Sequence, residues 1–241
     1  MSRLETMERY LSAHAADKDE SGGRSDMRSR PFVTISRQAG GGGHQLAEVL
    51  MDVFEQQADT DLFGGWQVFD RKLCEIVAGN PTYSKSMDSL VAEKYRSKTE
   101  EFFHQVIRPT IDQDIVMHQV FRVVAAVASI GKSIIIGRGA SEVTRDMGPK
   151  LSMRLVAPEE VRIPRVMDYY GLDERAAREE ARRLDTSRAR LLKTHFQVDI
   201  EDPMRYDVVW NTGEVSLDTI AESVMAALRS EVGVLSSEIS R

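Results

Sequence analysis

The stretch VTISRQAGGGGHQLAEVL, residues 33–50, contains the three features that decide the fold. A short β-type run comes first, four consecutive glycines follow, and an amphipathic helical pattern begins directly after them. A glycine-rich turn between a strand and a helix can hold phosphate, because its backbone N–H groups converge and the helix N-terminus is partly positive. The usual phosphate loop then carries a lysine and a serine or threonine, whereas this chain has Gly43 and Gln45.

The glycine run alone leaves two interpretations open. It is either a nucleotide site without its usual cation or a tight strand-to-helix turn with no ligand. In the first case the phosphate would meet the backbone of Gly40, Gly41, Gly42 and Gly43. Arg37 and His44 flank the loop and are candidates for its positive charge. For His44, a solvent-facing place in the first helical turn is an equally good interpretation.

The composition excludes several classes of protein. A chain of 241 residues with 41% hydrophobic residues fits one domain of ordinary to large size. The net charge of −6 argues against a broad nucleic-acid surface, so we expect no nucleic-acid partner. No apolar run reaches the length of a membrane span, and the single cysteine suggests a reducing compartment. We therefore expect a cytoplasmic protein without a membrane partner.

Short apolar strands alternate with helical patterns along the chain from residue 31 onward. This alternation predicts an α/β fold with a parallel sheet that is covered on both faces. The expected strands are 32–36, 66–70, 133–137, 151–157 and 206–212. The expected helices are 44–57, 71–79, much of 82–131, two helices within 158–196, and a last helix with Ser216 as its N-cap.

Two further strands end in residues that suit an anion site. Asp70 and Arg71 follow the second expected strand, and Gly137, Arg138 and Gly139 follow the third. In open α/β sheets, ligands bind at the carboxyl ends of the strands. An arginine after a strand is usually solvated or salt-bridged, but two of them beside a glycine loop indicate an anion site.

The segment RAAREEARRLDTSRARLLKTHF, residues 175–196, is rich in arginine. Its first part fits a solvated helix with ion pairs between residues four positions apart. Asp185, Thr186 and Ser187 favour a turn, which would place Arg188 and Arg190 on a mobile tip. An arginine-bearing hairpin that closes over phosphates suits phosphoryl transfer, and it would replace the missing lysine of the loop.

Taken together, these segments resemble the cytidylate kinase-like family of P-loop nucleoside monophosphate kinases. The resemblance runs from about residue 32 to 229. It implies a three-layer P-loop kinase fold with a five-stranded parallel sheet and a helical lid. It also implies a domain over 31–241, with a helical acceptor-side insertion over 80–130 and a lid over 172–196. Residues 1–30 read as a flexible N-terminal arm, because 17–30 is polar and charged.

The resemblance implies an ATP- and Mg²⁺-dependent kinase that acts on a nucleotide or a related small phosphorylated acceptor. By the same resemblance, Asp185, Arg188 and Arg190 are catalytic lid residues, and Asp70, Arg71 and Arg138 bind the acceptor. Cytidylate kinases carry lysine, threonine and aspartate where this chain has Gly43, Gln45 and Gly139.

Two alternatives to an enzyme stay open: a nucleotide-binding regulatory protein that has lost catalysis, and a scaffold that uses residues 1–30 to bind partners. The histidines show no zinc-ligand spacing with the single cysteine, so we expect no metal site of the protein's own. The sequence does not predict the oligomeric state.

Overall fold

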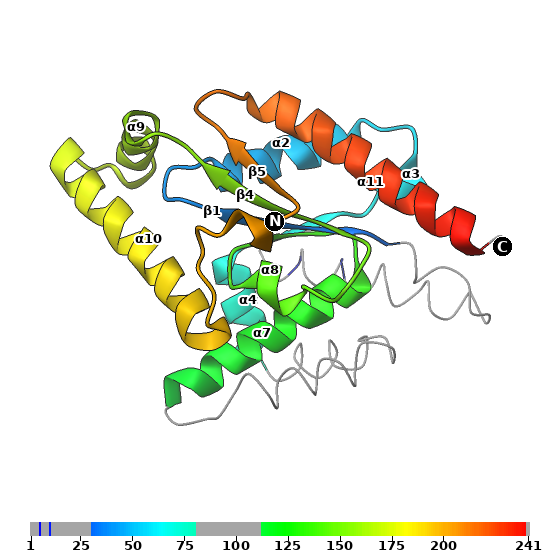
Figure 1. Ribbon diagram of the computed structural model, residues 1–241, viewed down its shortest axis with the longest axis horizontal. Helices are drawn as coiled ribbons and strands as arrows, with labels where there is room; N and C mark the ends of the chain where they lie inside the picture. The colour runs from blue at the N-terminus through cyan, green and yellow to red at the C-terminus, as the bar shows by residue number, and fades with distance from the viewer. Residues whose placement is uncertain (1–4, 6–9, 11–29, 81–111, 240–241) are drawn as a thin grey trace.

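The computed structural model describes residues 5, 10, 30–80 and 112–239, and it has the α/β architecture that the sequence predicts (Figure 1). Its elements in chain order are β1 Phe32–Arg37, α2 Gly43–Glu55, α3 Thr60–Phe63, β2 Gln67–Phe69, α4 Arg71–Ala78, α7 Asp112–Ile130, β3 Ser133–Ile136, α8 Ala140–Val143, β4 Lys150–Val156, α9 Glu159–Tyr170, α10 Glu174–Phe196, the 3₁₀ turn η2 Pro203–Arg205, β5 Val208–Asn211 and α11 Leu217–Ile239.

Five parallel strands form one sheet in the order β2-β3-β1-β4-β5. β1 lies at the centre, where Val33 is opposite Ile134 of β3 and Leu151 of β4. All five predicted strands are confirmed, each within two residues of its predicted bounds. Because the strands run in the same direction, the loops that follow β1, β2 and β3 meet at one edge of the sheet.

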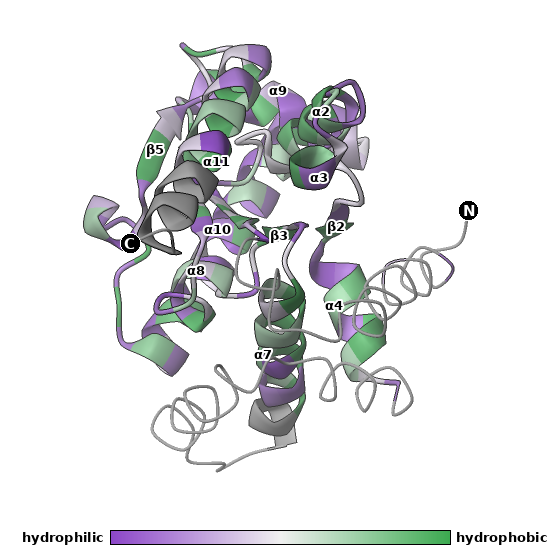
Figure 2. Cartoon of the chain, turned by 90° about the vertical axis from the view of Figure 1, so that its right-hand side faces the viewer, coloured by the Kyte–Doolittle hydropathy of each residue, from purple (hydrophilic) through white to green (hydrophobic). Residues whose placement is uncertain are grey.

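The sheet separates two hydrophobic cores, which makes the three layers. Successive side chains of a strand point to opposite faces, and β1 follows this rule. Val33 and Ile35 pack toward α2 and α11, whereas Phe32 packs toward α4 and α7. Ile134 joins the first core and Ile135 the second. Figure 2 shows the same division, with α2, α3 and α11 on one side of the strands and α4 and α7 on the other.

A third, smaller cluster lies beyond the end of the sheet. α9 and α10 pack against each other there, and Ile163, Val166, Ala177 and Ala181 are buried between them (Figure 1). Ala39, from the loop after β1, belongs to the same cluster and is also buried. The apolar faces of the two helices thus cover the back of the glycine loop.

The helices agree with the sequence pattern at most of their ends. Ser216 is the N-cap of α11, since its Oγ accepts a hydrogen bond from the N–H of Thr219 at 3.1 Å. Gly171 ends α9 in the left-handed conformation, and Asp173 caps the start of α10. Of the helical insertion expected over 80–130, α7 is present, and residues 81–111 lie outside the described residues.

The sequence predicts a turn at Asp185–Ser187, and this prediction is wrong. α10 runs without interruption from Glu174 to Phe196, so these residues lie in the middle of a helix. Asp and Ser favour turns when their side chains bond the local backbone. Here the Asp185 carboxylate accepts bonds from the distant residues Ala39 and Arg162 instead. These tertiary contacts remove the reason for a break.

Among the residues that the structure describes, no helix combines the length and the apolar character that crossing a membrane requires.

Tyr10, from the expected N-terminal arm, is part of the α4–α7 core. It is 4% exposed, and its ring packs edge-on against Phe69 with the ring centroids 5.2 Å apart. Its hydroxyl donates to the carbonyl oxygen of Gly131 at 2.6 Å. The arm therefore contributes at least one side chain to the domain, and the domain boundary at residue 30 stays a prediction.

We expect Tyr10→Phe to lower the free energy of unfolding by about 1 to 3 kcal/mol, because it leaves the buried Gly131 carbonyl without this donor. Chemical denaturation monitored by circular dichroism measures the change. Tyr169→Phe is the matched control, since Tyr169 is 65% exposed; its effect should stay within about 0.5 kcal/mol. Equal effects of the two substitutions would show that the Tyr10 hydroxyl makes no contribution.

Candidate active site

The glycine loop spans Gln38–Gly42 and connects β1 to α2. Gly40 and Gly42 have φ angles of 72° and 85°, a region that side chains other than glycine rarely adopt. A Cβ atom on Gly40 would overlap the carbonyl oxygen of Arg162, so no other residue fits there without a shift of α9. The glycines are therefore needed for the path of this loop.

The N-terminus of α2 is open to an anion. Gly42 is its N-cap and supplies no side-chain hydrogen bond, and the first turn contains no acidic residue. The N–H groups of this turn thus lack the side-chain acceptor that usually caps a helix. Together with the helix dipole, they favour a negatively charged ligand.

Residues from α9 and from the end of β5 fix the carbonyl side of the loop. Arg162 donates to the Ala39 oxygen at 3.0 Å, and Arg165 donates to the Gly40 oxygen at 3.3 Å. Thr212 Oγ1 donates to the Gly41 oxygen at 3.2 Å and accepts from Arg165. Because the loop carbonyls point toward these donors, the opposite side of the loop is left for a ligand.

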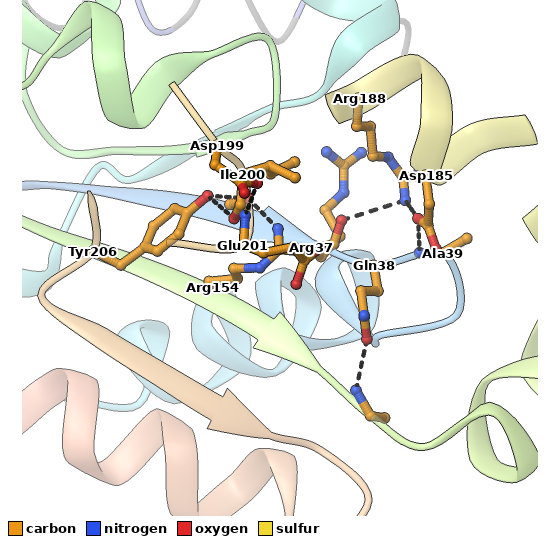
Figure 3. Close-up of polar contacts among 12 residues, drawn as sticks. Arg37, Gln38, Ala39, Arg154, Asp185, Arg188, Asp199, Ile200, Glu201 and Tyr206 are labelled. Atoms are coloured by element: carbon orange, nitrogen blue, oxygen red, sulfur yellow. Dashed lines mark hydrogen bonds and ion pairs between the residues drawn. The ribbon is translucent and has the colours of Figure 1, made fainter. Parts of the chain in front are cut away.

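The Asp185 carboxylate attaches α10 to the same loop (Figure 3). One of its oxygens accepts the Ala39 N–H at 2.7 Å and an Arg188 N–H at 3.0 Å, and the other accepts from Arg162 at 3.0 Å. Asp185 does not line the cavity described below. Its three partners place it as a residue that positions the loop and the two arginines.

The two arginines that the sequence predicts for the lid lie in different environments. Arg188 lines the cavity, is 22% exposed, and also donates to the Arg37 carbonyl oxygen at 3.3 Å (Figure 3). Arg190 is exposed and does not line the cavity. Residues two positions apart point to nearly opposite sides of a continuous helix, so the unbroken α10 brings only one of them to the site.

Arg37 and Arg138 bring two more guanidinium groups to the edge of the sheet. Burial, followed by the charges of Arg188 and Arg138, lowers the pKa of Arg37 to about 9. Burial, followed by the charge of Arg71, also lowers the pKa of Arg138. Positive charge therefore costs free energy here, and a bound anion would remove that cost.

On the acceptor side, one carboxylate holds two arginines. Glu75 Oε1 accepts from Arg138 at 3.1 Å and from Arg71 at 2.9 Å. The Nε atom of Arg138 is buried and has no hydrogen-bond partner among the described residues. The Asp70 carboxylate caps α4 by accepting the Leu73 N–H at 2.8 Å. Within the described part of the chain, Arg138 thus has one buried donor that no protein acceptor satisfies.

Gly139 explains one departure from the cytidylate kinase pattern. Its φ angle is 66°, and a Cβ atom there would lie 2.9 Å from Cε2 of Phe196 and 3.3 Å from Cδ2 of Leu191. The end of α10 therefore occupies the space that an aspartate at this position would need.

His44 lies in the first turn of α2, beside the end of α9. Its ring is nearly parallel to that of Tyr169 at the end of α9, with the centroids 6.3 Å apart. Burial, followed by the charge of Arg37, lowers the pKa of His44. The imidazole is therefore mainly neutral at pH 7, and the positive charge beside the loop comes from arginines.

These groups surround a cavity of about 600 Å³, a size typical of small-molecule sites. Its floor is the glycine loop, and its walls come from α4, the turn after β3, α9 and α10. The cationic side chains that line it are Arg37, Arg71, Lys72, Arg138, Arg165 and Arg188, and the acidic ones are Glu48, Asp70 and Glu75. The cavity is thus cationic in a protein whose net charge is −6.

A family model described as the cytidylate kinase-like family matches residues 32–214. The chain belongs to this cytidylate kinase-like family. The match covers β1 to β5 and therefore includes the glycine loop, the Gly-Arg-Gly turn and α10 of this kinase-like protein.

One solved structure shares the fold of this family member, and two others show a weaker likeness. An uncharacterized protein from Eubacterium ventriosum is 21% identical, with a TM-score of 0.63 over 83% of this chain and 99% of that one. A protein from Thermus thermophilus is 16% identical, with a TM-score of 0.40 and 83% and 97% coverage. A shikimate kinase from Bacteroides thetaiotaomicron is 12% identical, with a TM-score of 0.39 and 87% and 98% coverage. None of the curated proteins that were compared matches the chain.

Sequence reasoning missed the residues that fix the back of the loop in this kinase-like site. Arg162 and Arg165 lie three residues apart, on the helix that follows Pro158 after β4, and Thr212 ends the last predicted strand. The spacing of the two arginines puts them on one side of a helix. This spacing was the feature of the sequence that could have identified them. Nothing in the sequence around Thr212 indicates that it contacts the loop.

We expect Gly40→Ala to lower the free energy of unfolding by roughly 3 kcal/mol, since it combines a left-handed backbone with an overlap on the Arg162 carbonyl. Gly65→Ala is the matched control. Gly65 has a φ angle of 77° but open space at its Cβ position, so the expected cost is only about 1 kcal/mol. Urea denaturation compares the two. A Gly40→Ala protein as stable as the control would contradict the described packing of α9 on the loop.

Proposed function

We propose that this protein is an ATP-dependent phosphotransferase that acts on a nucleotide or a related small phosphorylated acceptor. One observation carries the proposal: three guanidinium groups, from Arg37, Arg138 and Arg188, line one cavity above a glycine loop whose helix N-terminus has no side-chain cap. Phosphoryl transfer depends mainly on positioning and on stabilising negative charge, and this arrangement supplies both. Membership of the cytidylate kinase-like family supports the same reaction class.

The described residues fit the phosphates of ATP. The residues Gly40–Gly43 carry no side chains of their own, and the Arg37 side chain lies against Gly43. The Gly41 N–H donates to the Gln38 carbonyl, so the other loop N–H groups and the first turn of α2 would hold the β- and γ-phosphates. Arg188 would contact the transferred group from the lid, where a guanidinium fork binds two phosphate oxygens.

Carboxylates beside the loop fit a magnesium ion that is carried by the nucleotide. The charges of Asp70 and Glu48 both act on His44, which places them near the start of α2. Mg²⁺ is usually held by one or two carboxylates together with substrate phosphates, so these two residues would hold it. When bound, the ion would neutralise charge on the phosphates during transfer. Among the described residues, no group of three or more metal-binding side chains would hold an ion without the nucleotide.

Arg138 is the proposed contact for the phosphate of the acceptor. Glu75 now accepts one of its N–H groups, and the buried Nε stays free. A phosphate oxygen could take that donor and exchange with Glu75 for the other. We propose that Arg71, which is mostly exposed, supports Arg138 by sharing Glu75 at the mouth of this subsite.

The regulatory alternative rests on the same site. The loop has no lysine at Gly43, and Gly139 replaces the acceptor-side aspartate of cytidylate kinases. A protein that binds nucleotide without transferring phosphate would show both changes. The deciding experiment measures ADP formation from ATP and Mg²⁺ with each nucleoside monophosphate and with small phosphorylated metabolites. Titration calorimetry of the nucleotides, with and without Mg²⁺, accompanies it. Binding without transfer to any acceptor would favour the regulatory protein.

We expect Arg188→Ala to lower kcat by on the order of 10³-fold, as the loss of a catalytic arginine does elsewhere. ATP binding should fall much less, because the loop backbone remains. Arg190→Ala is the matched control from the same helix, and its kcat should equal that of the wild type, since Arg190 is exposed and away from the cavity. Steady-state kinetics, with thermal unfolding to confirm folding, measure both variants. Equal losses for the two would refute a specific role for Arg188.

A further inference from the structure

The side chain of Arg37 lies against the place where a side chain on the first residue of α2 would begin. Arg37 is the last residue of β1, and Gly43 is the first residue of α2. A Cβ atom on Gly43 would lie 3.1 Å from Cγ and 3.2 Å from Cδ of Arg37, which is closer than ordinary packing. The aliphatic part of Arg37 therefore crosses the N-terminus of α2 directly above Gly43.

The far end of the Arg37 side chain reaches the turn after β3. A Cβ atom on Gly137 would overlap Nη1 of Arg37. Gly137 has a φ angle of 76°, which favours glycine, and a side chain there would displace the Arg37 guanidinium. Arg37 thus runs from the end of β1, across the glycine loop, to the edge where the acceptor-side arginine begins. Two glycines, one on each side, make room for it.

The Arg37 guanidinium has no protein partner within the described part of the chain. It makes no hydrogen bond and no ion pair with any described residue, while Arg188 donates only to its backbone oxygen. Figure 3 shows the same arrangement, with the Arg37 side chain beside Arg188 and the dashed line ending on the Arg37 carbonyl. The group lines the cavity, and its nearest charges include the guanidinium groups of Arg188 and Arg138. A guanidinium group in this position is suited to bind an anion from the cavity.

From this placement we infer that Arg37 is the phosphate-binding cation of the loop, which has moved from the first turn of α2 to the last residue of β1. Its ligand is the terminal part of a polyphosphate. Gly43 is then a consequence of the move and no longer a sign of lost function. The inference rests on the proposed function only where the polyphosphate is taken to be ATP; the phosphate contact itself requires no transfer.

The chemistry of the two cations differs in a testable way. A lysine ammonium acts as a compact point charge, whereas a guanidinium offers a planar fork that contacts two phosphate oxygens at once. A lysine at Gly43 would crowd the Arg37 side chain from its Cβ atom onward, so we expect Arg37 to shift if it is added. The site should therefore accept either cation but not both.

Binding of inorganic tripolyphosphate, measured by titration calorimetry, tests the inference without any need for catalysis. Arg37→Met keeps the aliphatic chain above Gly43 and removes the charge, and we expect it to weaken binding ten- to hundredfold. Arg37→Ala should show the same loss. Arg183→Ala is the control, since Arg183 is an exposed arginine of α10 that pairs with Glu180; its affinity should equal that of the wild type.

An exchange of the two positions gives the sharpest result. Gly43→Lys alone should weaken tripolyphosphate binding, because it displaces the Arg37 side chain. The double variant Arg37→Gly/Gly43→Lys should recover affinity to within about tenfold of the wild type, since it restores one cation in the same space. Thermal unfolding confirms that each variant is folded. If the Gly43→Lys variant binds tripolyphosphate at least as well as the wild type, the inference that the two side chains compete for one space is wrong.

The outcomes separate the inference from the proposed function. The protein could bind tripolyphosphate through Arg37 and yet transfer no phosphate. That result would support the inference and refute the proposed phosphotransferase function. A wild-type protein that does not bind tripolyphosphate would overturn the inference. A folded Arg37→Met protein that binds it as tightly as the wild type would do the same.

Discussion

The arrangement of the site depends on the hydrogen bonds that the Asp185 carboxylate accepts. It accepts the N–H of Ala39 in the glycine loop and donors from Arg162 on α9 and Arg188 on α10. One side chain therefore connects the loop to both α9 and α10. A partly buried carboxylate that receives three such donors is costly to leave unpaired, so these contacts depend on one another. The position of Arg188 over the loop follows from this network.

Charge is distributed unevenly between the two sides of the glycine loop. On the back, carbonyl groups receive Arg162, Arg165 and Thr212, and the hydrogen bonds there are satisfied within the protein. On the front, Arg37 and Arg188 face a cavity together with the uncapped start of α2. Low dielectric strengthens such interactions, so a polyphosphate would gain more here than at an exposed cationic patch. Arg162 and Arg165 thus hold the loop carbonyls, and Arg165 also lines the cavity that Arg37 and Arg188 face.

The sequence predicted the frame of this fold well. The five strands follow from short apolar runs, and the parallel direction of the strands follows from their alternation with helices. The Ser216 cap was predictable because capping is a local interaction between neighbouring residues. Such features depend on contacts within a few positions of the chain, which a single sequence displays directly.

What the sequence could not predict depends on distant contacts. The turn at Asp185–Ser187 is absent because Asp185 bonds a residue 146 positions away, and no local pattern reveals this. The burial of Tyr10 against α7 is equally non-local. Arg37 was found as a candidate from its place beside the loop, but its path above Gly43 required coordinates. In each case the outcome depends on a contact between residues that are far apart in the sequence.

A crystal structure of the protein with a non-hydrolysable ATP analogue and Mg²⁺ tests the central claim most directly, namely that the arginines around this loop hold a polyphosphate. We predict that the β- and γ-phosphates lie on the N–H groups of Gly40, Gly42 and Gly43, since that of Gly41 donates to the Gln38 carbonyl, with the Arg37 guanidinium about 3 Å from their oxygens. Arg188 should contact the same phosphates from α10. An analogue bound away from the loop, or one bound at the loop with Arg37 turned toward a carboxylate of the protein, would contradict the claim.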